Sequence, residues 1–169
     1  MSVIHPFDAI KAEEIALTAK LVRENHKGEK VHFTQIDRLD PPKNDMLKYL
    51  ALERAGSSNL PAIPRRTYAY YYLNHKMPVY KAILNVTYGH VIVAKAIEGI
   101  AAAPLLPEDL MEVEAIAYNH PKVLAEVEKL QLPKSGEWSL AIDPWMYGTD
   151  DEHKTEEPMI QCYVYLKRN

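Results

Sequence analysis

The sequence predicts an α+β protein built from two tandem units, residues 1–99 and residues 104–169. A segment with helical spacing of apolar residues is followed by strand-like segments of alternating apolar residues, and this order begins again after residue 104. The chain has 169 residues, of which 47% are hydrophobic and 25% are charged. This length and balance are typical of one or two folded domains rather than of a disordered chain.

Two helices and a first strand are expected near the start of the chain. Apolar residues recur at helical spacing over residues 8–25, which predicts an amphipathic helix. Alternation over residues 30–39 predicts a strand that ends at Pro41-Pro42. Asn44 is the candidate cap of a second helix, and Gly56 follows where a C-terminal glycine is expected.

Three strand-like runs, residues 66–74, 78–87 and 90–98, predict an antiparallel meander with turns at Asn74-His75-Lys76 and Tyr88-Gly89. One face of each run is apolar, and we expect the helix over residues 8–25 to cover that face. The residues of this apolar face are Ala69, Tyr71, Leu73, Tyr80, Ala82, Leu84, Val86, Val91 and Val93.

The second unit is expected to be smaller. It has a helix near residues 107–118, a shorter helix opened by Pro121, and strands at residues 137–142 and 160–166. A sheet of two or three strands is at the lower limit of independent stability. We therefore expect an incomplete sheet that contacts the first unit or another chain, and a homodimer through the open sheet edge is one such arrangement.

Charge and composition exclude several classes of function. Twenty basic and twenty-three acidic residues give a net charge of −3, and no basic cluster exceeds Arg65-Arg66, so nucleic acid is not an expected partner. The apolar-rich stretch 97–106 is too short to span a membrane, and residues 1–6 do not resemble a secretory signal. With a single cysteine, Cys162, no intramolecular disulfide forms, and we expect a cytoplasmic protein without metal or cofactor.

Four residues are candidates for a catalytic or binding role. Tyr70 and Tyr72 lie with Tyr68 on the strand face that points away from the apolar side, where their phenols are available as hydrogen-bond donors. His32 and His75 are candidate general acids or bases, because imidazole titrates near neutral pH. The alternative is that these are ordinary surface residues of strands, in which tyrosine is common.

Other polar residues carry weaker signals. His153 lies among acidic residues and is a candidate cation ligand, although a mobile acidic loop explains the same pattern. Cys162 alternates with Ile160 and Val164, which favours a buried, inert thiol over a nucleophile. Asp143-Pro144-Trp145 places a carboxylate beside an indole, and we expect a structural role for it.

Seven short sequence segments occur in a fixed order, and together they identify a family more specifically than any one of them does. They are His5-Pro6-Phe7-Asp8, Glu13-Glu14-Ile15, Leu39-Asp40-Pro41-Pro42-Lys43, Pro64-Arg65-Arg66, Gly99 with Pro104 before the helix at 107–114, residues 143–150 beginning Asp143-Pro144-Trp145-Met146, and residues 158–165. Over nearly the whole chain they resemble the N-terminal part of the copper amine oxidases, in particular the cytosolic or peroxisomal fungal type. The resemblance implies two small domains of cystatin-like architecture, the N2 and N3 domains, the second of them truncated here.

The departures from that family determine what function we expect. The resemblance implies a large catalytic β-sandwich after these two domains, with copper held by three histidines, two of them in a His-x-His pair, and a quinone made from the tyrosine of an Asn-Tyr-Asp/Glu motif. None of the seven histidines here is two residues from another, and none of the eleven tyrosines lies between Asn and an acid. We therefore expect that the chain by itself does not oxidise amines.

Two functional interpretations remain. In the first, a free-standing relative of these domains binds a small molecule and acts as a metal-independent cyclase or isomerase, with Tyr70 and Tyr72 as donors and His32 or His75 as the proton shuttle. In the second, the chain is a non-catalytic accessory or scaffold domain, or a fragment of a longer oxidase, that binds protein through its open sheet edge. The sequence favours the first interpretation slightly.

Overall fold

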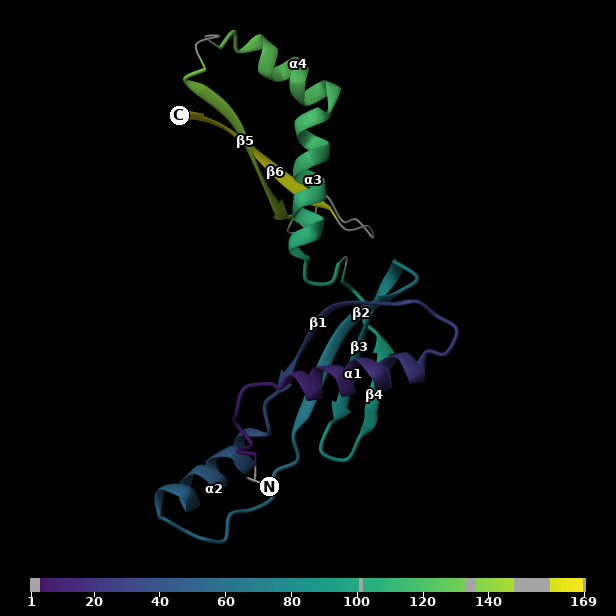
Figure 1. Cartoon of the computed structure of the whole chain (residues 1–169), viewed down its shortest axis with the longest axis vertical. Helices are drawn as coiled ribbons and strands as arrows, with labels where there is room; N and C mark the ends of the chain where they lie inside the picture. Colours follow the sequence, from purple (N-terminus) through teal and green to yellow (C-terminus); the bar gives the residue numbers. More distant parts are fainter. Residues whose placement is uncertain (1–3, 101, 133–135, 148–158, 169) are drawn as a thin grey trace. The chain divides into compact units, whose positions relative to one another are not determined.

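The computed structural model of the chain describes residues 4–100, 102–132, 136–147 and 159–168, in two compact units, Met1–Ala103 and Pro104–Asn169 (Figure 1). Four helices and two antiparallel sheets confirm the predicted α+β class. The elements are α1 (Ala12–Asn25), β1 (Val31–Leu39), α2 (Lys43–Arg54), β2 (Arg66–Leu73), β3 (Lys76–Asn85), β4 (His90–Ala96), α3 (Pro107–Asn119), α4 (Pro121–Lys129), β5 (Trp138–Met146) and β6 (Ile160–Arg168). None of these helices combines the length and apolar content that crossing a bilayer requires.

The first unit is a four-stranded meander, in the order β1-β2-β3-β4, with α1 lying across one face (Figure 1). The core between them consists of side chains with no solvent exposure: Val22 from α1 and Ala69, Tyr71, Ala82 and Leu84 from the sheet. These four strand residues belong to the face that the alternation predicted, so this prediction is confirmed. The buried apolar area is what holds the helix to the sheet.

Arg65, which is only 7% exposed, fixes the N-terminal segment against the start of β2. Its Nε and Nη2 atoms donate to the Glu14 carboxylate of α1 at 2.6 and 2.8 Å. The remaining guanidinium hydrogens reach backbone carbonyl oxygens at 3.0–3.2 Å, those of His5, Pro6, Asp8 and Ala9. We call this arrangement the Arg65 clamp, because a single buried cation holds two segments that are about fifty residues apart in the chain.

The helix α1 begins at Ala12, later than the predicted residue 8. The carbonyl oxygens of Asp8 and Ala9 accept hydrogen bonds from Arg65 and are therefore used outside the helix. One turn into α1, Thr18 donates to the Glu14 carbonyl at 2.7 Å. Since its hydrogen is used there, the buried contact of 2.7 Å with Thr67 has Thr67 as the donor.

The prediction that Asn44 caps the second helix is wrong. Pro42 occupies the cap position of α2 in an extended conformation, and no side chain makes a capping hydrogen bond. The helix begins at Lys43, directly after this proline, so Asn44 is already its second residue. The helix is joined to the N-terminal segment by His5, whose Nε2 lies 2.9 Å from the Glu53 carboxylate and whose ring meets Tyr49 edge-on.

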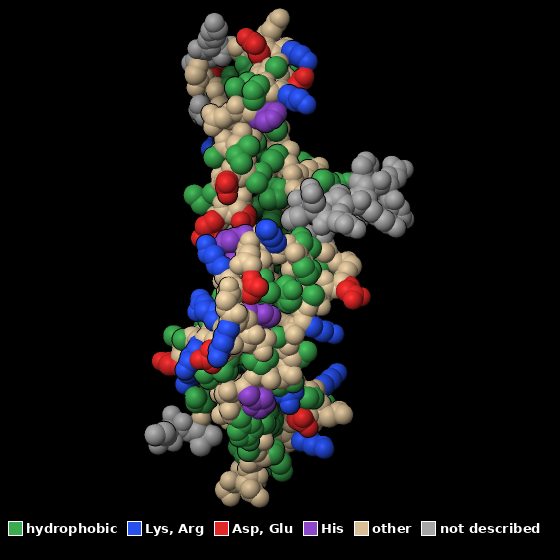
Figure 2. Space-filling view, turned by 90° about the vertical axis from the view of Figure 1, so that its right-hand side faces the viewer, with side chains coloured by type: hydrophobic (Ala, Val, Ile, Leu, Met, Phe, Trp, Pro, Cys, Tyr) green, Lys and Arg blue, Asp and Glu red, His purple; other side chains and the backbone are tan. Residues whose placement is uncertain are grey.

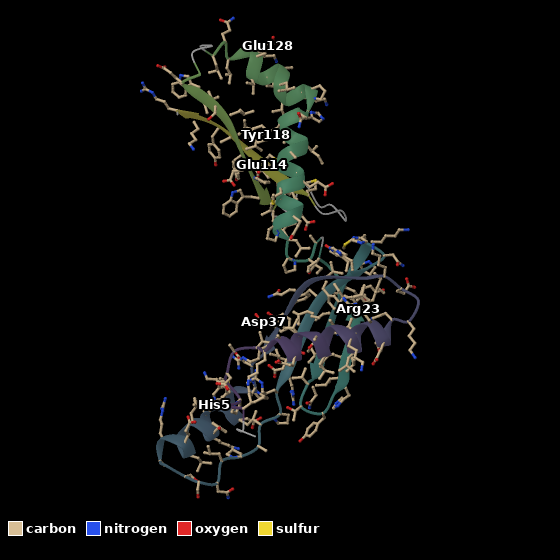
Figure 3. The ribbon with its side chains drawn as sticks, viewed as in Figure 1. His5, Arg23, Asp37, Glu114, Tyr118 and Glu128 are labelled. Carbon is tan, nitrogen blue, oxygen red and sulfur yellow. The ribbon has the colours of Figure 1, made fainter. Side chains whose placement is uncertain are left out.

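The second unit has a much smaller core. The strands β5 and β6 form a two-stranded sheet, and Tyr118 of α3 donates its hydroxyl to the Leu140 carbonyl at 2.9 Å (Figure 3). Ile142, 5% exposed, is the one buried hydrophobic side chain among the described residues of this unit. The strand β5 extends past the predicted residue 142 to Met146, because Pro144, paired with Cys162, lies in a sheet of two edge strands, where proline is tolerated.

Cys162 is partly buried, whereas the sequence predicted a buried thiol. It lies on the predicted strand beside Ile160 and Val164, but Val164 itself is 48% exposed. A single helix over a two-stranded sheet leaves that strand incompletely covered.

Replacing Arg65 with Met should lower the free energy of unfolding of the first unit by about 3–5 kcal/mol, because the Glu14 carboxylate, whose side chain is only 13% exposed, would lose its partner. Urea denaturation followed by circular dichroism measures the change. Lys20→Met is the matched control, since the Lys20–Glu24 pair is exposed and 3.9 Å apart, and its loss costs at most about 0.5 kcal/mol. A loss below about 1 kcal/mol in Arg65→Met would contradict the role of the clamp.

The acid stability of the first unit should depend on Glu14. Hydrogen bonds from Arg65 hold the pKa of Glu14 below its usual 4.5, although burial acts in the opposite direction. A carboxylate with a lowered pKa contributes its full stabilisation above its unfolded-state pKa and loses it as the pH falls through its folded-state pKa. The difference in free energy of unfolding between the wild-type chain and Glu14→Gln should therefore be constant from pH 7 to about 5 and shrink below that. Denaturation at a series of pH values tests this, and a difference that grows on acidification would refute it.

Candidate functional site

The candidate site is the face of the four-stranded sheet opposite α1. Tyr68, Tyr70 and Tyr72 of β2 alternate with the buried Ala69 and Tyr71, so they lie on this outer face, as the sequence predicted. They are half-buried rather than fully exposed. We call the three residues the tyrosine face.

Lys81 of β3 links two members of the tyrosine face. Its Nζ lies 5.8 Å from the ring centre of Tyr68 and 5.3 Å from that of Tyr70, and these two rings meet edge-on 5.7 Å apart. Both lysine distances are within the range of a cation–π contact. The ammonium group is thus attracted by two aromatic rings at once.

Tyr68 has a further polar partner and a perturbed pKa. The Gln35 side chain donates to its hydroxyl at 3.0 Å. Burial raises the pKa of Tyr68, the neighbouring Asp37 (Figure 3) raises it further, and Lys81 acts in the opposite direction. At neutral pH this phenol is therefore protonated and available as a hydrogen-bond donor.

Tyr72 has a structural contact within its unit. Its hydroxyl oxygen accepts a hydrogen bond at 2.8 Å from the backbone amide of Ala103, which is only 2% exposed. The phenol thus anchors the segment that follows β4. The hydroxyl hydrogen, which the sequence interpretation assigned as a donor to a ligand, is not used in this contact.

His32 and His75 are brought together by the turn between β2 and β3. Their ring centres lie 4.3 Å apart with the planes tilted by 41°. The turn is tied to the segment before β1, since Asn74 accepts from the Lys30 amide at 2.9 Å and donates its own amide to the Lys30 carbonyl at 2.8 Å. The Asn74 side chain also donates to the Glu29 carboxylate.

Of the four predicted site residues, the two histidines are in direct contact. The register places Tyr72 opposite His32, and Tyr70 opposite Gln35 further along the strand. All of these residues are on the outer side of the sheet or at its end, away from the core under α1. The face is therefore part of the surface of the first unit and not a lining of its core.

The remaining candidates lie elsewhere. His153 is outside the described residues. Asp143, Pro144 and Trp145 belong to β5 in the second unit, and Trp145 is 59% exposed. Cys162 pairs with Pro144 in the same sheet.

Sequence reasoning missed two buried polar arrangements. One is the Arg65 clamp, whose acceptors are mostly backbone carbonyls and leave no side-chain pattern. The other is a contact of 2.8 Å between His26 Nε2 and the hydroxyl of the fully buried Tyr71, whose pKa burial raises to about 12. The forty-five residues between His26 and Tyr71 give no local signal for this pair.

The known proteins to which this chain is similar are copper amine oxidases. No protein-family model matches the chain. The crystal structure of a copper-containing benzylamine oxidase from Hansenula polymorpha matches with a TM-score of 0.79 and 47% identity, over 98% of this chain and 25% of that one. Copper amine oxidase-like protein cao2 of Schizosaccharomyces pombe is 23% identical over 163 residues, covering 96% of this chain and 20% of the relative. Copper amine oxidase 1 of Aspergillus niger is 23% identical over 171 residues, covering 97% and 25%.

The chain thus spans about a fifth to a quarter of the length of these relatives. The residues that the structure describes do not fit a copper centre of three histidines. In the described ranges, no group of three or more His, Cys, Asp or Glu side chains is arranged to hold a metal ion. His5 and His26 are used in hydrogen bonds to Glu53 and Tyr71, and His120 accepts from the Lys122 amide.

Replacing Lys81 with Met should destabilise the first unit by about 0.5–1 kcal/mol, because two cation–π contacts are lost. It should also raise the pKa of Tyr68, since Lys81 lowers that pKa. Denaturation and tyrosinate absorbance titration measure the two effects. Lys95→Met is the matched control, because Lys95 is exposed on β4 directly opposite Lys81. Equal effects of the two substitutions would contradict the contact.

Proposed function

We propose that this chain, which is related to the N-terminal region of the copper amine oxidases, is a non-catalytic pair of domains that docks onto an oxidase polypeptide. The observation that carries the proposal is the incompletely covered sheet of the second unit. The relatives are four to five times longer than the segment they share with this chain, so their remaining sequence is the natural candidate for what covers it.

The exposed surface of the second unit supports this role. Most of the exposed large hydrophobic side chains of the described residues belong to it, and hydrophobic side chains, green in Figure 2, reach the molecular surface. Among the residues described, β5 and β6 have only each other as strand partners, so each strand has one edge without a neighbour. Open edges and uncovered apolar side chains favour the addition of another polypeptide.

One face of this sheet is aromatic. The register places Trp145 opposite Gln161, Asp143 opposite Tyr163 and Ala141 opposite Tyr165, so the three aromatic side chains share a face. Trp145 is 59%, Tyr163 44% and Tyr165 50% exposed, and the two tyrosine rings stack 6.4 Å apart. We call Trp145, Tyr163 and Tyr165 the aromatic docking face, because tryptophan and tyrosine contribute most to the energy of protein interfaces.

The cyclase or isomerase interpretation has less support. Its candidate residues lie on the outer side of a sheet, while acid–base catalysis benefits from a site that excludes water. Tyr72 and Tyr70 also have structural contacts, with the Ala103 amide and with Lys81. The cytoplasmic location and the homodimer expected from the sequence stay predictions.

Binding should be measured between the whole chain and a Hansenula polymorpha benzylamine oxidase from which the matching quarter has been deleted. We expect a heterocomplex in analytical ultracentrifugation, weakened at least about tenfold by Trp145→Lys, as is typical of an interface hot spot. The matched control is Tyr88→Lys, which changes an aromatic residue 68% exposed in the first unit. That variant should bind like the wild type.

The second arm of the experiment is ultracentrifugation of the chain alone. Self-association that Trp145→Lys abolishes would assign the aromatic docking face to a second copy instead. A chain that stays monomeric both alone and in the mixture would refute the docking function.

A further inference from the structure

We propose that His32 and His75 form a binding site for a divalent first-row transition metal ion, with two imidazole ligands. This inference goes beyond the docking function and does not depend on it. It also differs from a copper centre of three histidines, which the described residues do not fit. Neutral imidazole is the commonest protein ligand for zinc, nickel and copper.

The separation of the rings suits two ligands of one ion. Imidazole nitrogens bind such ions at about 2.0–2.1 Å, which places the centres of two adjacent ligand rings roughly 4.5–5 Å apart. The observed separation is 4.3 Å. The two rings are therefore close to the separation that shared coordination of one ion requires.

The ring nitrogens of both residues are available. In the described part of the chain no hydrogen bond to either ring is recorded, whereas His5, His26 and His120 have hydrogen-bond partners. His32 is half-buried on β1 and held by the sheet, while His75 is exposed in the turn. One ligand is thus fixed and the other is open to solvent, so an ion can enter.

The backbone around His75 is preorganised in an unusual way. Asn74 and His75 have φ values of 55° and 56° between the paired residues Leu73 and Lys76, as a two-residue type I′ turn requires. Glycine fits the second position of such a turn best, so histidine there adopts a strained conformation. The hydrogen bonds of Asn74 to Lys30 and Glu29 hold this turn and place the imidazole of His75 over His32.

The charged residues near the turn and the number of available ligands determine which metal ions the site binds. Glu29, hydrogen-bonded to Asn74, adds negative charge near the turn, whereas Lys30 and Lys76 flank it with positive charge. No third metal-ligating side chain joins the pair in the described residues. The other coordination positions are therefore filled by water, and we expect a two-ligand site that prefers nickel or zinc over the oxygen-seeking magnesium ion.

The test uses the full chain and Ni²⁺. Isothermal titration should give one site per chain, and added Ni²⁺ should raise the melting temperature, because it binds the folded state. Mg²⁺ at the same concentration should do neither.

The informative variant is His75→Gly, which keeps the turn and removes the ligand. Without metal we expect its melting temperature to equal or exceed that of the wild type, while Ni²⁺ affinity falls at least tenfold. His32→Gln should lose the same affinity. His90→Gln is the matched control, because His90 is an exposed histidine at the start of β4, and it should bind like the wild type.

Three outcomes would overturn the proposal. They are no Ni²⁺ binding by the wild-type chain, unchanged binding by His75→Gly, and equal losses in His90→Gln and His75→Gly. The docking experiment contains no added metal. Failure of the metal-site proposal therefore leaves the docking proposal standing, and failure of the docking proposal leaves the metal site standing.

Discussion

The first unit depends on a buried charge that must be neutralised and fully hydrogen-bonded. A guanidinium has five donor hydrogens, and leaving any of them unpaired in the interior is costly. Arg65 meets this requirement with one carboxylate and four backbone carbonyls. The N-terminal segment, α1 and the start of β2 therefore adopt positions that are set by a single side chain.

The two units differ in how much apolar surface they bury. In the first, α1 lies over a four-stranded sheet and fully buries Val22 and Tyr71. In the second, a two-stranded sheet and α3 bury Ile142, while Trp145 and Val164 stay at the surface. Because burial of apolar surface is the main stabilising contribution, the incomplete core and the proposed docking role are two aspects of one feature.

Local patterns allowed much of the first unit to be predicted. Alternation over residues 66–72 separated the tyrosine face from the buried side, since successive side chains of a strand point in opposite directions. Helical spacing likewise identified α1, although its first residue was misplaced because Arg65 binds carbonyls that a helix would have used. Patterns of side chains contain no information about such backbone acceptors.

The sequence indicates which residues are candidates for the site, but it does not indicate how they are arranged in space. The sequence predicts His32 and His75 as titratable groups on or beside strands, but their contact arises from the β1–β2 register and from the left-handed backbone of the turn. The predicted strand over residues 137–142 was likewise too short, since β5 continues through Pro144 to Met146. In a sheet of two strands that proline lies on an edge strand, where its missing amide hydrogen is less harmful.

The small core of the second unit has a consequence for how it meets a partner. With so little surface buried, partial opening of this part costs far less free energy than opening of the first. In the proposed complex its strands and helices would therefore be able to readjust as the partner binds, and both molecules would determine the final shape of the interface. The first unit, whose core is larger, would keep its structure in such a complex.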